Sequence, residues 1–174
     1  DQYRLIKRVH KSLEIDESKW PAKQCQWFIN EQKDEGLRAA SIETYGDEYT
    51  ANMTKVYAAY EQACNRGGMV DFGELLLRSH ELWLKAPTLL AHYQKRFQQI
   101  LVDEFQDTNA IQYAWLRVLA GGKSKVTAVG DDDQSIYGWR GARIENIQQF
   151  SQDFIGAETV RLEQNYCSSA NILQ

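Results

Sequence analysis

The 174-residue sequence predicts an α/β fold in which a helical part precedes an incomplete parallel β-sheet. Up to Phe97, apolar residues recur at the spacing of amphipathic helices. After Phe97, short apolar runs alternate with helical stretches, and this strand–helix–strand order is typical of a parallel sheet. We therefore expect a helical subdomain over residues 1–95 and part of an α/β domain over residues 96–174.

The helical part is expected to contain five helices. Asp1 is placed to cap the first, Pro21 suits the first turn of the second, and Asp71, with Glu74 three residues later, is typical of a capped N-terminus. Their apolar stripes most simply form a core. The expected helices run over Tyr3–Leu13, Pro21–Gly36, Asp47–Arg66, Asp71–Leu84 and Leu89–Phe97.

The α/β part is expected to alternate strands with helices. Its first apolar run stops abruptly at Asp103, as a buried parallel strand would. The expected strands cover Ile100–Val102, Lys125–Val129 and Thr159–Leu162, and the expected helices cover Ala110–Ala120 and Ile144–Phe154.

Composition excludes several classes of protein. With 20 basic and 24 acidic residues, the formal charge of −4 argues against a basic clamp for duplex DNA, but it leaves base stacking open. No apolar run is long enough to cross a membrane. Cys25, Cys64 and Cys167 are far apart, which argues against a disulfide framework or a zinc site and favours a reducing, cytoplasmic compartment.

Two carboxylates, Asp103 and Glu104, follow the first expected strand, at the end where α/β sheets bind ligands. One carboxylate there can hold Mg²⁺ through water while its neighbour activates an attacking water, as phosphoryl transfer requires. The alternative is a solvated strand end or a helix cap without catalytic function.

The second expected strand is followed by three carboxylates and an aromatic loop. Asp131–Asp133 suggest a metal-dependent nuclease, but no His or Lys completes such a site, and Gln134 can instead sense a γ-phosphate. Tyr137, Trp139 and Arg140 lie on a glycine-flanked loop suited to stacking single-stranded bases. The alternative is an ordinary turn whose aromatic rings pack inward.

The sequence contains no phosphate-binding loop. Gly122-Lys123-Ser124 resembles the end of one, but Arg117 stands where the pattern needs glycine, and a strand follows instead of a helix. An ATPase built on these carboxylates would keep that loop outside the 174 residues. We therefore expect an internal fragment of a longer protein, without ATPase activity by itself.

Three ordered stretches resemble motifs of the superfamily 1 helicases. Val102–Asn109 is similar to motif II, Val129–Ala142 to motif III, and Arg161–Tyr166 to the start of motif IV. With Gln32–Leu37 and Val70–Phe72 in the helical part, the whole chain resembles the UvrD, Rep and PcrA group. The resemblance implies that residues 1–95 are a helical insertion and residues 96–174 the second half of the first RecA-like ATPase domain.

The resemblance also implies a role for each site residue. Asp103 would bind Mg²⁺, Glu104 would act as general base, and Gln134 would couple the γ-phosphate of ATP to the DNA-binding loop. Tyr137, Trp139 and Arg140 would contact single-stranded DNA. The parent would be an ATP-dependent 3′–5′ helicase that unwinds partly duplex DNA in mismatch and nucleotide excision repair, with repair proteins as partners.

One position departs from the family pattern. Cys167 stands where the family has an arginine that reaches the γ-phosphate, and a thiol cannot supply that fixed positive fork. Either the residue has been changed or the contact is lost; the alternative is that Cys167 is an ordinary small residue after a strand.

Two other functions stay open. The chain can be a binding module for single-stranded DNA without catalysis, or a metal-dependent nuclease that uses Asp103, Glu104 and Asp131–Asp133. We also expect an open sheet edge near Ile100–Val102, which would favour self-association.

Overall fold

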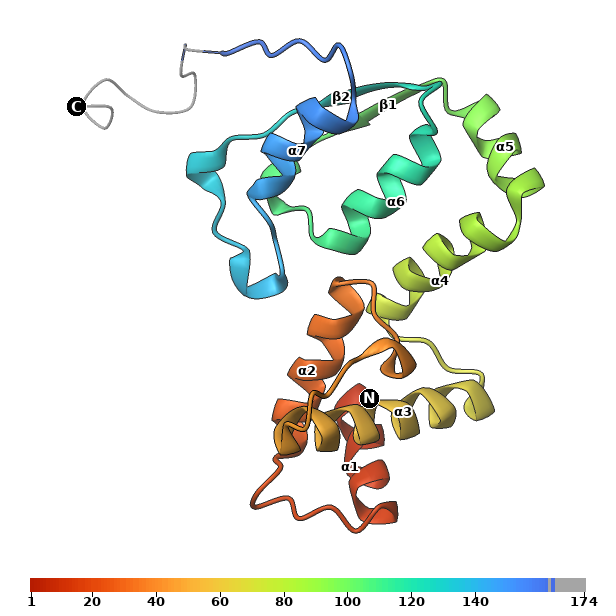
Figure 1. Cartoon of the computed structure of the whole chain (residues 1–174), viewed down its shortest axis with the longest axis vertical. Coiled ribbons are helices and arrows are strands. Elements are labelled where there is room, and N and C mark those ends of the chain that lie inside the picture. The colour runs from red at the N-terminus through yellow and green to blue at the C-terminus, as the bar shows by residue number, and fades with distance from the viewer. Residues whose placement is uncertain (163, 165–174) are drawn as a thin grey trace.

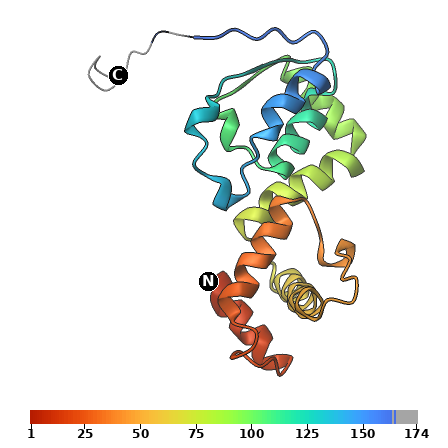
Figure 2. The ribbon, with the colours of Figure 1, turned by 60° about the vertical axis from the view of Figure 1, so that its left-hand side comes forward.

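The computed structural model describes residues 1–162 and 164 and confirms the α/β fold class. One lobe holds the first three helices, and a second holds the sheet with its covering helices (Figure 1). Helix α4 joins the two lobes, as the rotated view also shows (Figure 2). Cys167 and half of the expected start of motif IV, residues 163, 165 and 166, lie outside the described residues.

The five helices expected before the sheet all form. They are α1 (Gln2–Ser12), α2 (Ala22–Asp34), α3 (Glu48–Gly67), α4 (Phe72–Lys85) and α5 (Pro87–Arg96), with a 3₁₀ turn at Ala39–Ser41. Asp47 and Asp71 cap α3 and α4 through their side chains, whereas Asp1 makes no capping bond. Pro21 lies at the N-cap of α2, one residue before its first turn.

The core of the helical lobe comes from the predicted apolar stripes. Helices α1, α2 and α3 pack against one another and bury one face each. The fully buried residues of this core include Ile6, Cys25, Ile29, Met53, Val56, Tyr57 and Tyr60.

A buried ionic network fixes the start of α4. Lys33 of α2 is 2% exposed, and its Nζ lies 2.8 Å from both Asp71 Oδ2 and Glu74 Oε2. Glu74 also pairs with Arg38 at 2.8 Å and with Arg78 at 2.5 Å. The Glu74 carboxylate therefore turns toward three cations, and the helix cap comes from Asp71 alone.

Within the described residues, the sheet consists of two parallel strands. Strands β1 (Gln99–Val102) and β2 (Lys125–Ala128) pair with Val102 opposite Ala128. Helices α6 (Ala110–Ala120) and α7 (Glu145–Asp153) belong to the same lobe, and α6 also packs on α4. Their core is centred on Phe105, Tyr113 and Leu116.

The expectation that Ile100–Val102 is fully buried is wrong. Leu101 is 78% exposed, while Ile100 and Val102 pack against the lobe's core. A parallel strand is buried on both faces only when helices cover both, and in the described residues this core contacts one face of the pair.

The strand expected at Thr159–Leu162 does not form. Its apolar residues Val160 and Leu162 are 79% and 86% exposed. A strand needs a hydrogen-bonding neighbour, and among the described residues β1 and β2 pair only with each other.

Across the described residues, no helix has the length and apolar character that crossing a bilayer requires.

We expect Lys33→Met to lower the free energy of unfolding by about 3 kcal/mol, because it takes from Asp71 its partner cation and from the buried Glu74 carboxylate one of its three cations. Urea denaturation of the chain measures the loss. Lys19→Met is the matched control, since the Lys19–Glu48 pair is exposed and contributes less than about 1 kcal/mol. Equal losses in the two variants would show that the buried network does not anchor α4.

Stability should also fall at acid pH through Glu74. Burial raises the pKa of the Glu74 carboxyl, but hydrogen bonds from Lys33, Arg78 and Arg38 outweigh burial and lower it from 4.5 to about 2. The carboxylate therefore stabilises the fold fully above its unfolded pKa, and this contribution disappears as the pH falls from 4.5 toward 2.

Urea titrations at pH 7, 4.5 and 2.5 check this dependence. Glu74→Gln should be less stable than the parent at pH 7 and should lose less stability between pH 4.5 and 2.5. Parallel pH profiles for the two proteins would contradict the assignment.

Candidate functional site

The carboxyl ends of β1 and β2 bring the two polar loops together. Because the strands are parallel and in register, Asp103 and Gly130 follow them at the same edge of the sheet. The backbone N–H of Phe105 donates to the Val129 carbonyl at 2.9 Å, which continues the strand pairing into the loops. The structure therefore places the two predicted loops side by side.

Glu104 adopts a backbone conformation that is rare outside glycine. Its φ is +50°, and its N–H donates to Asp103 Oδ1 at 3.0 Å. A non-glycine residue in this region costs about 1–3 kcal/mol and persists where the surrounding structure enforces it, often at functional sites. Both carboxylates are exposed, so their oxygens can reach a ligand.

Gln106 links the two loops and was not predicted as a site residue. It is 1% exposed; its amide donates to Glu104 Oε2 at 2.6 Å, and its oxygen accepts from the Asp131 N–H at 3.1 Å. A Cβ on Gly130 would lie 2.6 Å from that oxygen, so this close approach requires glycine. Only the ability of an amide to donate and accept signals this role in the sequence.

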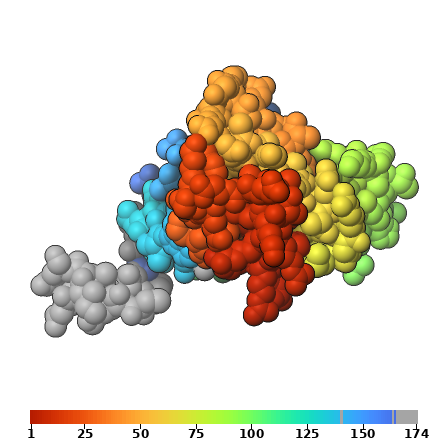
Figure 3. Space-filling model, turned by 90° about the horizontal axis from the view of Figure 1, so that it is seen from below, coloured from red at the N-terminus to blue at the C-terminus, as the bar shows by residue number. Residues whose placement is uncertain are grey.

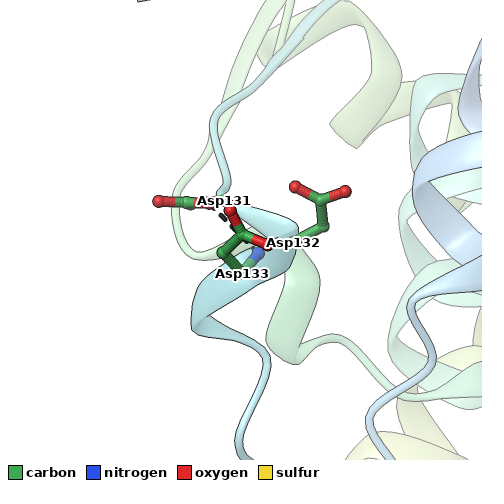
Figure 4. Close-up of side chains that lie close together, drawn as sticks. All are labelled: Asp131, Asp132 and Asp133. Atoms are coloured by element: carbon green, nitrogen blue, oxygen red, sulfur yellow. Dashed lines mark hydrogen bonds between the residues drawn. The ribbon is translucent and has the colours of Figure 1, made fainter. Parts of the chain in front are cut away.

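The three aspartates after β2 form an exposed cluster. Carboxylate oxygens of Asp131, Asp132 and Asp133 lie within 4.8 Å of one another (Figure 4). Gln134, the expected γ-phosphate sensor, donates to Asp131 Oδ2 at 2.6 Å. In the part of the chain that the structure describes, neither Asp103 nor Glu104 joins this cluster within that distance.

The aromatic loop presents its rings outward. Trp139 is 74% exposed and Tyr137 is 36% exposed, with ring centroids 6.3 Å apart. The alternative of an ordinary turn with its rings packed inward is therefore wrong for Trp139. The loop contains a 3₁₀ turn, Gly138–Arg140, and Arg140 is its last residue.

This loop faces the helical lobe across an open cleft of about 1950 Å³. Tyr137 and Trp139 line one wall, while Trp27 of α2 and Phe72 of α4 line the other. Trp27 is 61% and Phe72 is 93% exposed, and Lys23 Nζ lies 5.9 Å from the Trp27 ring. Seen from the helical end, the cyan loop segment lies beside the red-to-orange helices (Figure 3).

Sequence reasoning missed Trp27 and Phe72 as site residues. Trp27 reads as apolar bulk for α2, and Phe72 as part of a helix cap. Their exposure in the structure distinguishes them from core aromatic residues, since neither belongs to the cores of the described residues. Four exposed aromatic side chains on one cleft form a surface suited to flat, apolar rings of a ligand.

The chain is similar to known proteins along nearly its whole length. Residues 1–155 match the family model for the UvrD/REP helicase N-terminal domain. The chain is 63% identical over 173 residues to DNA helicase II of Escherichia coli, 59% to DNA helicase II of Haemophilus influenzae and 40% to the ATP-dependent DNA helicase PcrA of Staphylococcus aureus. Each alignment covers 99% of this chain but 24% of the relative, so the chain spans about a quarter of these curated proteins. The chain belongs to the UvrD/REP helicase N-terminal domain family.

Proposed function

We propose that the chain is part of an ATP-dependent DNA helicase. In this proposal residues 1–95 form the helical insertion and residues 96–174 the second half of the first RecA-like domain. The observation that carries it is the link through Gln106, which joins the carboxylate loop after β1 to the loop after β2 that continues to Trp139. A nucleotide site and a DNA site would thus share one strand edge.

The carboxylate loop suits the chemistry of ATP hydrolysis. Asp103 and Glu104 are exposed, and carboxylate oxygens are ligands that Mg²⁺ prefers. Asp103 would hold the ion through water and Glu104 would accept a proton from the attacking water, while bound Mg²⁺ neutralises charge on the phosphates. Gln134 would exchange its bond to Asp131 for the γ-phosphate. Residues outside the 174 would supply the phosphate-binding loop, so the chain alone would not hydrolyse ATP.

The aromatic cleft suits single-stranded DNA. With a net charge of −4, the chain would hold the strand mainly by stacking bases on Trp139, Trp27 and Phe72, with Lys23 as a local cation. A 3′–5′ direction, mismatch and excision repair, repair-protein partners and a cytoplasmic location belong to the same proposal and rest on the family resemblance.

The nuclease alternative has less support. It needs carboxylates from both loops around shared metal ions, and such two-metal sites place ions about 3.5–4 Å apart. In the described residues, Asp131–Asp133 cluster without Asp103 and Glu104.

Glu104→Gln in the full-length helicase tests the nucleotide site. Loss of the general base should lower kcat for ATP by about 10²- to 10⁴-fold, while ATP affinity changes little. Steady-state hydrolysis and equilibrium binding of a fluorescent nucleotide separate the two effects. The control is Glu158→Gln, which removes the same charge at an exposed residue. Full hydrolysis in Glu104→Gln would reject the proposed mechanism.

Trp139→Ala and Trp27→Ala in the same protein test the DNA site. Each should weaken binding of a labelled oligo-dT by about 5- to 150-fold, because stacking contributes about 1–3 kcal/mol per base. Fluorescence anisotropy measures the affinities. Tyr45→Ala is the control, since Tyr45 is 90% exposed but does not line the cleft. If Trp139→Ala bound as tightly as the parent, the cleft would not be the DNA site.

A further inference from the structure

The C-terminal end of α2 contacts the segments that follow both loops. Asp34 Oδ1 accepts a hydrogen bond from Asn109 Nδ2 at 2.9 Å, and Asn109 follows the carboxylate loop. The next residue, Glu35, forms an ion pair with Arg143, which follows the aromatic loop. The last residue of α2 and its C-cap residue thus contact the segments that leave both loops.

The two exits are also joined to each other. The Thr108 carbonyl accepts from the Arg143 N–H and from Asn146 Nδ2, both at 3.0 Å. Asn146 is 5% exposed, so this bond lies inside the sheet lobe. A displacement of Arg143 therefore acts directly on Thr108, one residue from Asn109.

The orientation of Asn109 is fixed from both ends. Its Oδ1 accepts from the Gln112 N–H at 3.0 Å and caps α6, which leaves its amide N–H groups to donate to Asp34. Gly141, with φ +78°, brings the backbone close to this contact, since a Cβ there would lie 3.5 Å from that of Asp34. The aromatic loop thus returns against α2 at this point.

The charged groups of these contacts are unfavourably placed or partly exposed. Asp34 and Glu35 are neighbouring acids at a helix C-terminus, where the helix dipole disfavours negative charge. Burial, with the nearby Glu35 charge, raises the pKa of Asp34 to about 6. The Arg143 and Glu35 side chains are 49% and 29% exposed, and such partly exposed pairs are weak. The Glu35–Arg143 pair can therefore break and re-form at small cost.

We propose that Asp34 and Glu35, with Asn109 and Arg143, form a positioning junction that couples the aromatic cleft to the carboxylate loop. This inference rests on the proposed function. Single-stranded DNA in the cleft would contact both α2 and the aromatic loop. A change in the distance between α2 and that loop would then act on the Glu35–Arg143 and Asp34–Asn109 contacts. The junction would then set how strongly single-stranded DNA stimulates ATP hydrolysis.

The test uses the full-length helicase and the variants Glu35→Arg, Arg143→Glu and the charge-swapped double variant. Each single variant should lower the ratio of DNA-stimulated to basal kcat by about 2- to 30-fold, with basal kcat, KM for ATP and Tm unchanged. The double variant should regain the ratio, because the pair is restored in reverse. Glu145→Gln, an exposed acid two residues from Arg143, is the control.

The outcomes separate the junction from the proposed function. Stimulation in the parent with an unchanged ratio in both single variants would overturn the junction alone. The junction would also be overturned if the ratio of DNA-stimulated to basal kcat fell together with Tm and did not return in the double variant. That result would indicate only a structural role. Absence of DNA-stimulated hydrolysis in the parent would overturn the proposed function, and the junction with it.

Discussion

The buried charge network around Glu74 is the constraint on which the arrangement of the two lobes depends. Glu74 and Asp71, the N-cap residue of α4, both pair with Lys33 of α2. Moving the first turn of α4 away from the helical lobe would therefore leave buried charges without partners, which is costly. Further along α4, Trp83 packs 6.1 Å from Trp115 of α6, ring centroid to ring centroid. Helix α4 therefore links the position of the helical lobe to that of the sheet lobe.

The loops that follow β1 and β2 are also held by shared contacts. Gln106 fixes the spacing between the Glu104 side chain and the Asp131 backbone, and the α2 terminus holds the segments that leave both loops. These contacts are hydrogen bonds and partly exposed ion pairs, whereas the lobes are stabilised by apolar cores. In the proposed function, these weaker polar contacts between the loops would let binding at one loop bias the other.

The proposed binding of single-stranded DNA by an acidic chain has a physical requirement. Neutralising phosphates would need a basic surface, and the formal charge of −4 does not supply one. In the proposed function, the exposed aromatic rings that line the cleft would provide binding energy that does not depend on net charge. Such a site would hold bases with little preference among them, as movement along a strand requires.

The sequence by itself determined the elements whose signals are local: the helices, the parallel strand pair and the loops with Asp103, Glu104 and Trp139. Periodicity, caps and breakers act within a few residues, so a single sequence contains them. Only the tertiary structure decided that Leu101 is exposed, that Thr159–Leu162 finds no neighbouring strand, that Glu74 serves a buried network, and that Trp27 and Phe72 line the cleft. Burial and pairing depend on partners far along the chain, and no local pattern specifies those partners.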